Sequence, residues 1–127
     1  MLDPLLLVHG WLALALSAFL LLFPRLFAYL ATGHWWAAGD EARLAAVFAR
    51  LTAAGAILVF LVASATRQSA RTSLRSASVI TLLAICLITA GIGALIPFSA
   101  MRAATIAGQL VFAFAYAWVL LFRPQEI

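Results

Sequence analysis

Arg50 is the side chain in this sequence whose type and position point most directly to chemistry. It follows Arg43 by seven residues within EARLAAVFARLTAAGAIL, so helical spacing places both arginines on one face. An arginine inside a segment apolar enough to cross a bilayer is costly and by default marks a functional site. Arg50 either contacts an anion, a lipid headgroup or a neighbouring subunit, or it extends its guanidinium to the nearby membrane surface. The sequence leaves both interpretations open.

His9, in the segment VHGWLALAL, is a candidate ligand for a haem iron or a pigment magnesium, because a neutral imidazole nitrogen binds such metals. The segment resembles the helices of light-harvesting proteins, in which a histidine lies among small residues with aromatic residues nearby. That resemblance implies a pigment ligand at His9. The alternative is a structural or interfacial histidine, and nothing else in the sequence requires a cofactor.

Aromatic residues in VFAFAYAWV should form two rows, because residues four apart share a helix face. Phe112 should then lie near Tyr116, and Phe114 near Trp118 on the other side. Packing or lipid contact is one use of these rings, and contact with a quinone or pigment is another. His34 precedes two tryptophans and fits the aromatic belt of a membrane surface.

Groups that catalysis or proton coupling requires are missing from the apolar segments. All four carboxylates, of Asp3, Asp40, Glu41 and Glu126, lie at segment ends, which argues against proton-coupled transport and against small multidrug exporters, whose first helix needs a glutamate. The filter motifs of small fluoride channels are also missing. Cys86 is the single cysteine, which excludes four-helix thiol oxidases that use cysteine pairs. Without a metalloprotease, nucleophile-elbow or P-loop motif, we expect neither an enzyme nor a metal site.

Four long apolar stretches must position these side chains, at residues 5–23, 42–65, 77–96 and 103–122. Each is close to the ~20 residues that a helix needs to cross the hydrocarbon core. A spanning segment must be helical, because lipid offers its backbone no hydrogen bonds. With 67% hydrophobic and 9% charged residues in 127, the sequence predicts an all-α polytopic membrane protein. We expect a single domain over 1–127, a bundle of four transmembrane helices.

Small residues predict a helix-packing interface on the second stretch, where Ala45, Ala49 and Ala53 recur at intervals of four. Such a row lets two helix backbones approach closely, within the bundle or with a partner. Gln109 belongs to the same prediction, because an amide inside the membrane must find a hydrogen-bond partner.

The arginine distribution predicts the orientation in the membrane. The connection over residues 67–75 carries three arginines, and the C-terminal tail carries Arg123. The opposite connections carry arginines at 25, 43 and 102, which two carboxylates partly offset. The positive-inside rule therefore places both termini in the cytoplasm. The net charge of +4 is too small and dispersed for nucleic-acid binding, and arginine without lysine in an alanine-rich chain suggests a bacterial inner membrane.

The order of features resembles a diffuse group of uncharacterised small four-helix bacterial inner-membrane proteins. The matching pieces are LLLVHGWLALALSAFLLLFP, the arginine before a small-residue helix in EARLAAVFARLTAAGAIL, and two further apolar helices. The resemblance implies no activity for particular residues. We expect a non-catalytic accessory or scaffold subunit of a respiratory or photosynthetic membrane complex, with the bilayer and other membrane subunits as partners. The alternative is a small transporter, or a lipid- or anion-binding protein centred on Arg50.

Overall fold

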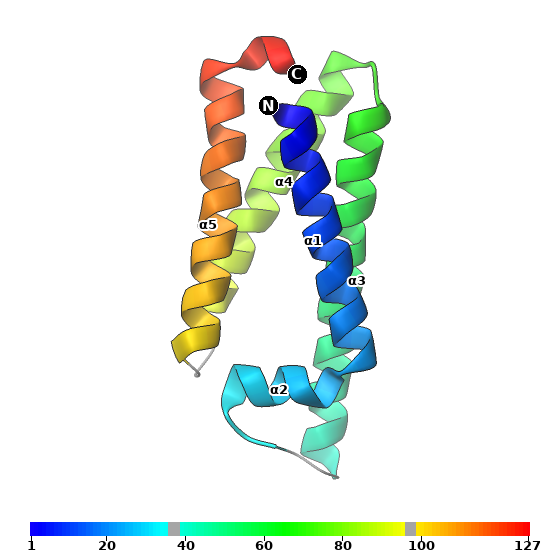
Figure 1. Cartoon of the computed structure of the whole chain (residues 1–127), viewed down its shortest axis with the longest axis vertical. Coiled ribbons are helices and arrows are strands. Elements are labelled where there is room, and N and C mark those ends of the chain that lie inside the picture. The colour runs from blue at the N-terminus through cyan, green and yellow to red at the C-terminus, as the bar shows by residue number, and fades with distance from the viewer. Residues whose placement is uncertain (36–38, 96–98) are drawn as a thin grey trace.

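The computed structural model describes residues 1–35, 39–95 and 99–127, and in this part of the chain every regular element is a helix (Figure 1). The elements are α1 (Leu2–Leu22), α2 (Pro24–Thr32), α3 (Asp40–Gln68), α4 (Thr72–Gly93), α5 (Ser99–Phe122) and the short 3-10 helix η1 (Pro124–Glu126). Four of these helices, α1, α3, α4 and Ala100–Phe122 of α5, are long and apolar enough to cross a membrane. The predicted four-helix membrane bundle is confirmed.

The helix ends differ from the predicted stretches by a few residues, because the helices continue into polar flanks. α3 includes Asp40 and Gln68, beyond the predicted 42–65. α4 ends at Gly93, and the predicted end at 96 lies outside the described residues. α1 ends at Leu22 because the next residue precedes Pro24, and a proline disfavours helical backbone in the residue before it.

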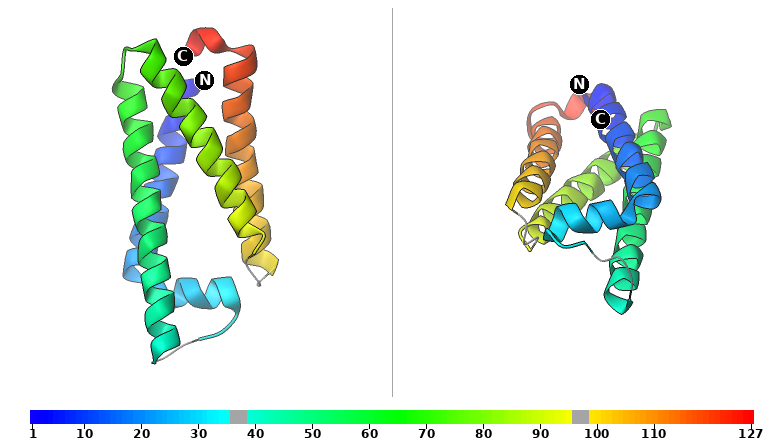
Figure 2. Two further views of the ribbon diagram at one scale, coloured as in Figure 1. Left: turned by 180° about the vertical axis from the view of Figure 1, so that it is seen from behind. Right: turned by 60° about the horizontal axis from the view of Figure 1, so that its bottom comes forward.

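The four long helices form two pairs, α1 with α3 and α4 with α5 (Figure 1). α4 joins the pairs: it starts beside α3 and runs diagonally until its other end lies beside α5 (Figure 2). Both termini and the α3–α4 connection lie at one end of the bundle, which we call the terminal end. α2 crosses the opposite end, which we call the α2 end.

α2 is a short amphipathic helix that lies across the bundle. Proline starts it, and Gly33 ends it in the left-handed region at φ 73°, a common helix stop. Phe27 and Ala28 are buried, and the helix packs mainly on α3. Tyr29 and Leu30 remain exposed. A helix with this pattern is suited to the membrane surface.

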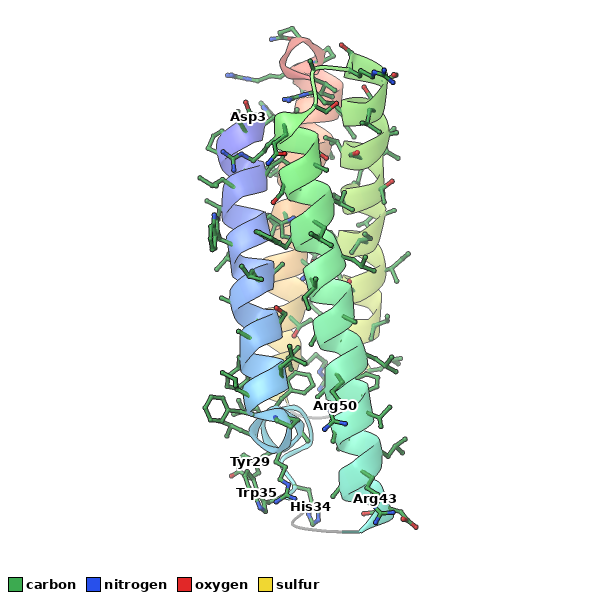
Figure 3. All side chains as sticks on the ribbon, turned by 90° about the vertical axis from the view of Figure 1, so that its right-hand side faces the viewer. Asp3, Tyr29, His34, Trp35, Arg43 and Arg50 are labelled. Carbon is green, nitrogen blue, oxygen red and sulfur yellow. The ribbon has the colours of Figure 1, made fainter. Side chains whose placement is uncertain are left out.

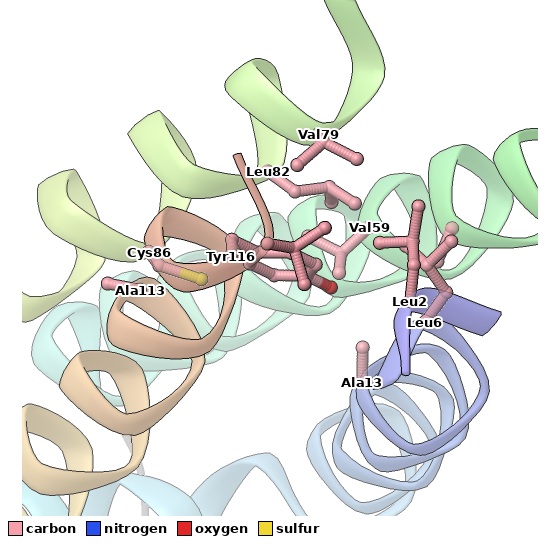
Figure 4. Close-up of a cluster of buried hydrophobic side chains, with 11 residues drawn as sticks. Leu2, Leu6, Ala13, Val59, Val79, Leu82, Cys86, Ala113 and Tyr116 are labelled. Atoms are coloured by element: carbon pink, nitrogen blue, oxygen red, sulfur yellow. The ribbon is translucent and has the colours of Figure 1, made fainter. Parts of the chain in front are cut away.

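Two buried clusters hold the bundle together. The larger one draws on all four long helices (Figure 4) and contains Leu2, Leu6, Ala13, Val59, Ala63, Val79, Leu82, Cys86, Ala113, Tyr116 and Val119. The smaller one lies at the α2 end and contains Leu20, Phe27, Ala49 and Ala53. The larger cluster joins the two pairs, whereas the smaller one holds α2 against α1 and α3, with Met101 of α5 packed beside it.

The outer surface of the bundle is apolar. Only 17% to 28% of each spanning window is buried inside the chain. Large side chains such as Trp11, Leu58 and Leu121 are more than half exposed. An apolar surface of this extent requires lipid or other apolar protein around it.

Candidate functional site

At the terminal end, Arg75 is satisfied by the chain itself. Its guanidinium lies 3.1 Å from a carboxylate oxygen of Asp3 and donates to the carbonyl oxygens of Thr66 and Ser69, each at 3.2 Å. These carbonyls end α3, where a cation is favoured by the helix dipole. Arg75 therefore ties the starts of α1 and α4 to the end of α3, and its role there is structural.

Within the bundle, His9 and Tyr116 connect the two helix pairs. The imidazole Nδ1 lies 2.7 Å from the phenolic oxygen, and the His9 ring stacks on Phe112 with centroids 4.2 Å apart. Both residues are buried, His9 with 5% and Tyr116 with 0% of its surface exposed. The pair satisfies two polar groups that would each be costly alone in an apolar interior.

The cofactor hypothesis for His9 stays a prediction, and the structure narrows its form. Nδ1 is already hydrogen-bonded and one ring face is covered, so a haem iron or pigment magnesium would have to bind Nε2. Among the described residues, no group of three or more His, Cys, Asp or Glu side chains is placed to hold a metal ion.

The two rows of aromatics on α5 are confirmed. Phe112 and Tyr116 both contact His9 on the inner side. Phe114 and Trp118 form a tilted pair with centroids 6.2 Å apart, and both are exposed. The outer row is therefore available to lipid or a partner.

The alanine row of α3 packs against its own chain. Ala49 and Ala53 are fully buried in the cluster with Leu20 of α1 and Phe27 of α2. Ala45 is half-buried and lines a small cavity between α2 and α3. Ala49 and Ala53 therefore pack on α1 and α2 within the chain, and these two side chains are not free to contact another subunit.

Gln109 lies on the inner face of α5, because it precedes Tyr116 by two turns of the helix. Its side chain is half-buried, and its amide makes no hydrogen bond to any described residue. The predicted role in helix packing stays a prediction. An amide at this depth still requires a partner from outside these residues.

Arg50 lies near the membrane surface at the α2 end. Thr66 lies level with the Asp3–Arg75 pair at the terminal end. Arg50 precedes Thr66 by about 24 Å of helical rise. In a hydrocarbon core ~30 Å thick, Arg50 therefore lies within about 6 Å of the opposite edge. Figure 3 shows Arg50 close to the height of α2 and Arg43 farther out. Arg43 is 4.0 Å from Asp40 in an exposed pair, which contributes little.

Arg25 joins this region from α2 and was not singled out by the sequence. It lines the same small cavity as Ala28, Ala42, Ala45 and Ala46. The sequence feature that could have indicated Arg25 is its place directly after Pro24, which starts an amphipathic segment. Its position relative to α3 depends on the orientation of α2, which periodicity does not give.

The two histidines lie apart. His34 lies at the α2 end (Figure 3), whereas His9 lies in the bundle. Near His34, Tyr29 and Trp35 form an edge contact with centroids 6.1 Å apart, as expected for a membrane-surface aromatic belt.

Comparisons of the chain with protein families, curated proteins and solved structures give no match.

Proposed function

We propose that this chain is a non-catalytic accessory or scaffold subunit of a larger bacterial inner-membrane complex, respiratory or photosynthetic, with both termini in the cytoplasm. It acts through contacts between transmembrane helices and with lipid. The observation that carries the proposal is a face of small, exposed residues on the first half of α5. This α5 small-residue face consists of Ala100, Ala103, Ala104, Ala107 and Gly108.

Contacts inside the chain show how this protein uses small residues. At Gly93 an added Cβ would lie 2.9 Å from a Thr105 methyl group, so α4 and α5 meet closely there. At Gly10 the nearest atom, of Ala63, would lie 3.4 Å away. At Gly108, by contrast, no described atom apart from its chain neighbours and the nearby backbone of α5 lies within 4 Å of such a Cβ. The α5 small-residue face therefore has the composition of a close helix contact but is exposed, with open space at Gly108.

A further transmembrane helix fits this face. Small side chains allow backbones to approach until dispersion contacts and weak Cα–H hydrogen bonds form, which is the main source of helix association in lipid. Lipid tails pack about as favourably on a leucine-rich helix surface as on a small-residue one. The exposed aromatic row, Phe114 and Trp118, continues the outer surface of α5 toward the terminal end.

The test is copurification from native membranes with a bulky substitution on the face. The double variant Ala104→Leu, Gly108→Leu should insert and fold, because both positions are exposed, but should lose a stoichiometric membrane partner. Ala54→Leu is the matched control, since Ala54 is an exposed alanine on α3. Equal recovery of the partner with all three proteins, or wild-type chain recovered only as a homo-oligomer, would refute the proposal.

A further inference from the structure

Three arginines at the α2 end, Arg25, Arg50 and Arg102, have no ion pair with a described group, and the first two lie on the helices that meet there, α2 and α3. Neither Arg25 nor Arg50 forms an ion pair or hydrogen bond with the described residues. Arg75 at the terminal end differs, because a carboxylate and two backbone carbonyls satisfy it. On the described part of α3, Glu41 carries the carboxylate nearest to Arg50 in the sequence. Glu41 lies about two and a half helical turns closer to the start of α3.

Arg25 and Arg50 lie on different helices, near the small cavity between α2 and α3. Arg25 lines the small cavity between α2 and α3, and it is the only charged residue among those that line it. Ala46 lines this cavity from α3, and Arg50 follows it by one helical turn, on the neighbouring surface. Arg25 and Arg50 therefore lie on the two helices that meet at this cavity, one lining it and the other one helical turn beyond it.

The depth of this junction matches the position of phospholipid headgroups. Arg50 lies close to the height of α2, the amphipathic helix that crosses this end of the bundle (Figure 3). Guanidinium groups bind phosphate oxygens through paired hydrogen bonds, and the interaction is stronger at a partly dehydrated surface than in water. Two arginines with a single phosphate leave a net charge that an anionic lipid compensates better than a zwitterionic one.

We propose that Arg25 and Arg50 together bind a phosphate group at the junction of α2 and α3, and that this phosphate belongs to the headgroup of an anionic phospholipid. Arg43, which the sequence grouped with Arg50, lies farther out beside Asp40 and contributes at most the surrounding positive field. The inference does not depend on the proposed subunit role, because it concerns lipid and not a protein partner.

The test counts lipids retained by the purified protein. Wild type is placed in nanodiscs of phosphatidylcholine with phosphatidylglycerol, released, and examined by native mass spectrometry. Arg25→Gln, Arg50→Gln should lower the retained phosphatidylglycerol by about tenfold, since each arginine near a membrane surface contributes a substantial attraction to anionic lipid. The matched control is Arg67→Gln, Arg71→Gln, which removes the same charge from exposed positions at the terminal end and should retain the lipid.

A second arm separates a lipid headgroup from a free anion. Protein in phosphatidylcholine alone is heated with inorganic phosphate or with chloride at equal ionic strength. Wild type stabilised by phosphatidylglycerol and not by inorganic phosphate supports the lipid assignment. Stabilisation by inorganic phosphate that the Arg25→Gln, Arg50→Gln variant lacks, without selective lipid retention, overturns the lipid source in favour of a soluble anion. Equal lipid retention by wild type and both double variants overturns the site itself.

Discussion

Removal of the Tyr116 hydroxyl tests how the two helix pairs are joined. The hydroxyl lies 2.7 Å from Nδ1 of His9, and this buried hydrogen bond joins α1 of one pair to α5 of the other. Tyr116→Phe keeps the ring in its place and leaves the His9 nitrogen unpaired in a buried site. We expect the bundle to remain folded but to become less stable.

The magnitude follows from the burial of both residues. A hydrogen bond between membrane helices is worth about 0.6 to 1.7 kcal/mol, and an unpaired buried polar group costs about 1 to 3 kcal/mol in proteins generally. Tyr116→Phe should therefore lower the free energy of unfolding by about 1 to 2 kcal/mol. Tyr29→Phe should change it little, because Tyr29 is 45% exposed at the α2 end.

A double-mutant cycle isolates the bond from the other contacts. His9→Phe keeps an aromatic ring beside Phe112, and the double variant removes both polar partners together. Unfolding is followed in bicelles as the fraction of denaturing detergent rises. The two single changes should be less than additive by about 0.6 to 1.7 kcal/mol. A coupling below about 0.5 kcal/mol, which is the scatter of independent sites, would refute the bond as the link between the pairs.

Three further predictions concern packing and orientation. Ala49→Leu should lower the free energy of unfolding by about 1 to 3 kcal/mol, because Ala49 is fully buried. Ala54→Leu on the outer surface should leave it unchanged. Similar free energies of unfolding for the two variants would contradict the packing of α3. Gly93→Ala should lower thermal stability, because its Cβ would lie 2.9 Å from a threonine methyl of α5, and Gly91→Ala should not, because its surroundings are open. A cysteine at Ser73 in a cysteine-free background should react with an impermeant maleimide only after the cell envelope is opened, and labelling in intact cells would reverse the predicted orientation.

The helices were predictable because the bilayer imposes their length and backbone pairing. Apolar stretches of about 20 residues leave few alternatives to a spanning helix. The division of the α5 aromatics into two rows was equally predictable, since it depends only on the spacing of residues along one helix. The sequence did not indicate which row faces inward, because both rows are apolar enough for lipid.

Contacts between distant segments could not be predicted from the sequence, because apolar residues on every helix are equally suited to many partners. His9 and Tyr116 are 107 residues apart, and nothing local selects one as the partner of the other. The alanine row of α3 was recognised as a packing surface, but its choice of α1 and α2 depends on how α2 folds back across the end of the bundle. The position of Arg25 beside α3 depends on the same orientation of α2.

Arg75 differs from Arg25 and Arg50 in how the fold pairs its charge, and this contrast separates structural from external roles. At the terminal end, Asp3 and the last carbonyls of α3 satisfy Arg75, so its charge stabilises the fold. At the α2 end, Arg25 and Arg50 receive no carboxylate or carbonyl from the described chain. A charge that the fold leaves unpaired beside the hydrocarbon core is stabilised by whatever lies around the protein. For Arg25 and Arg50 the proposed counter-charge is the phosphate of a lipid headgroup, whereas Arg75 has its counter-charge within the fold.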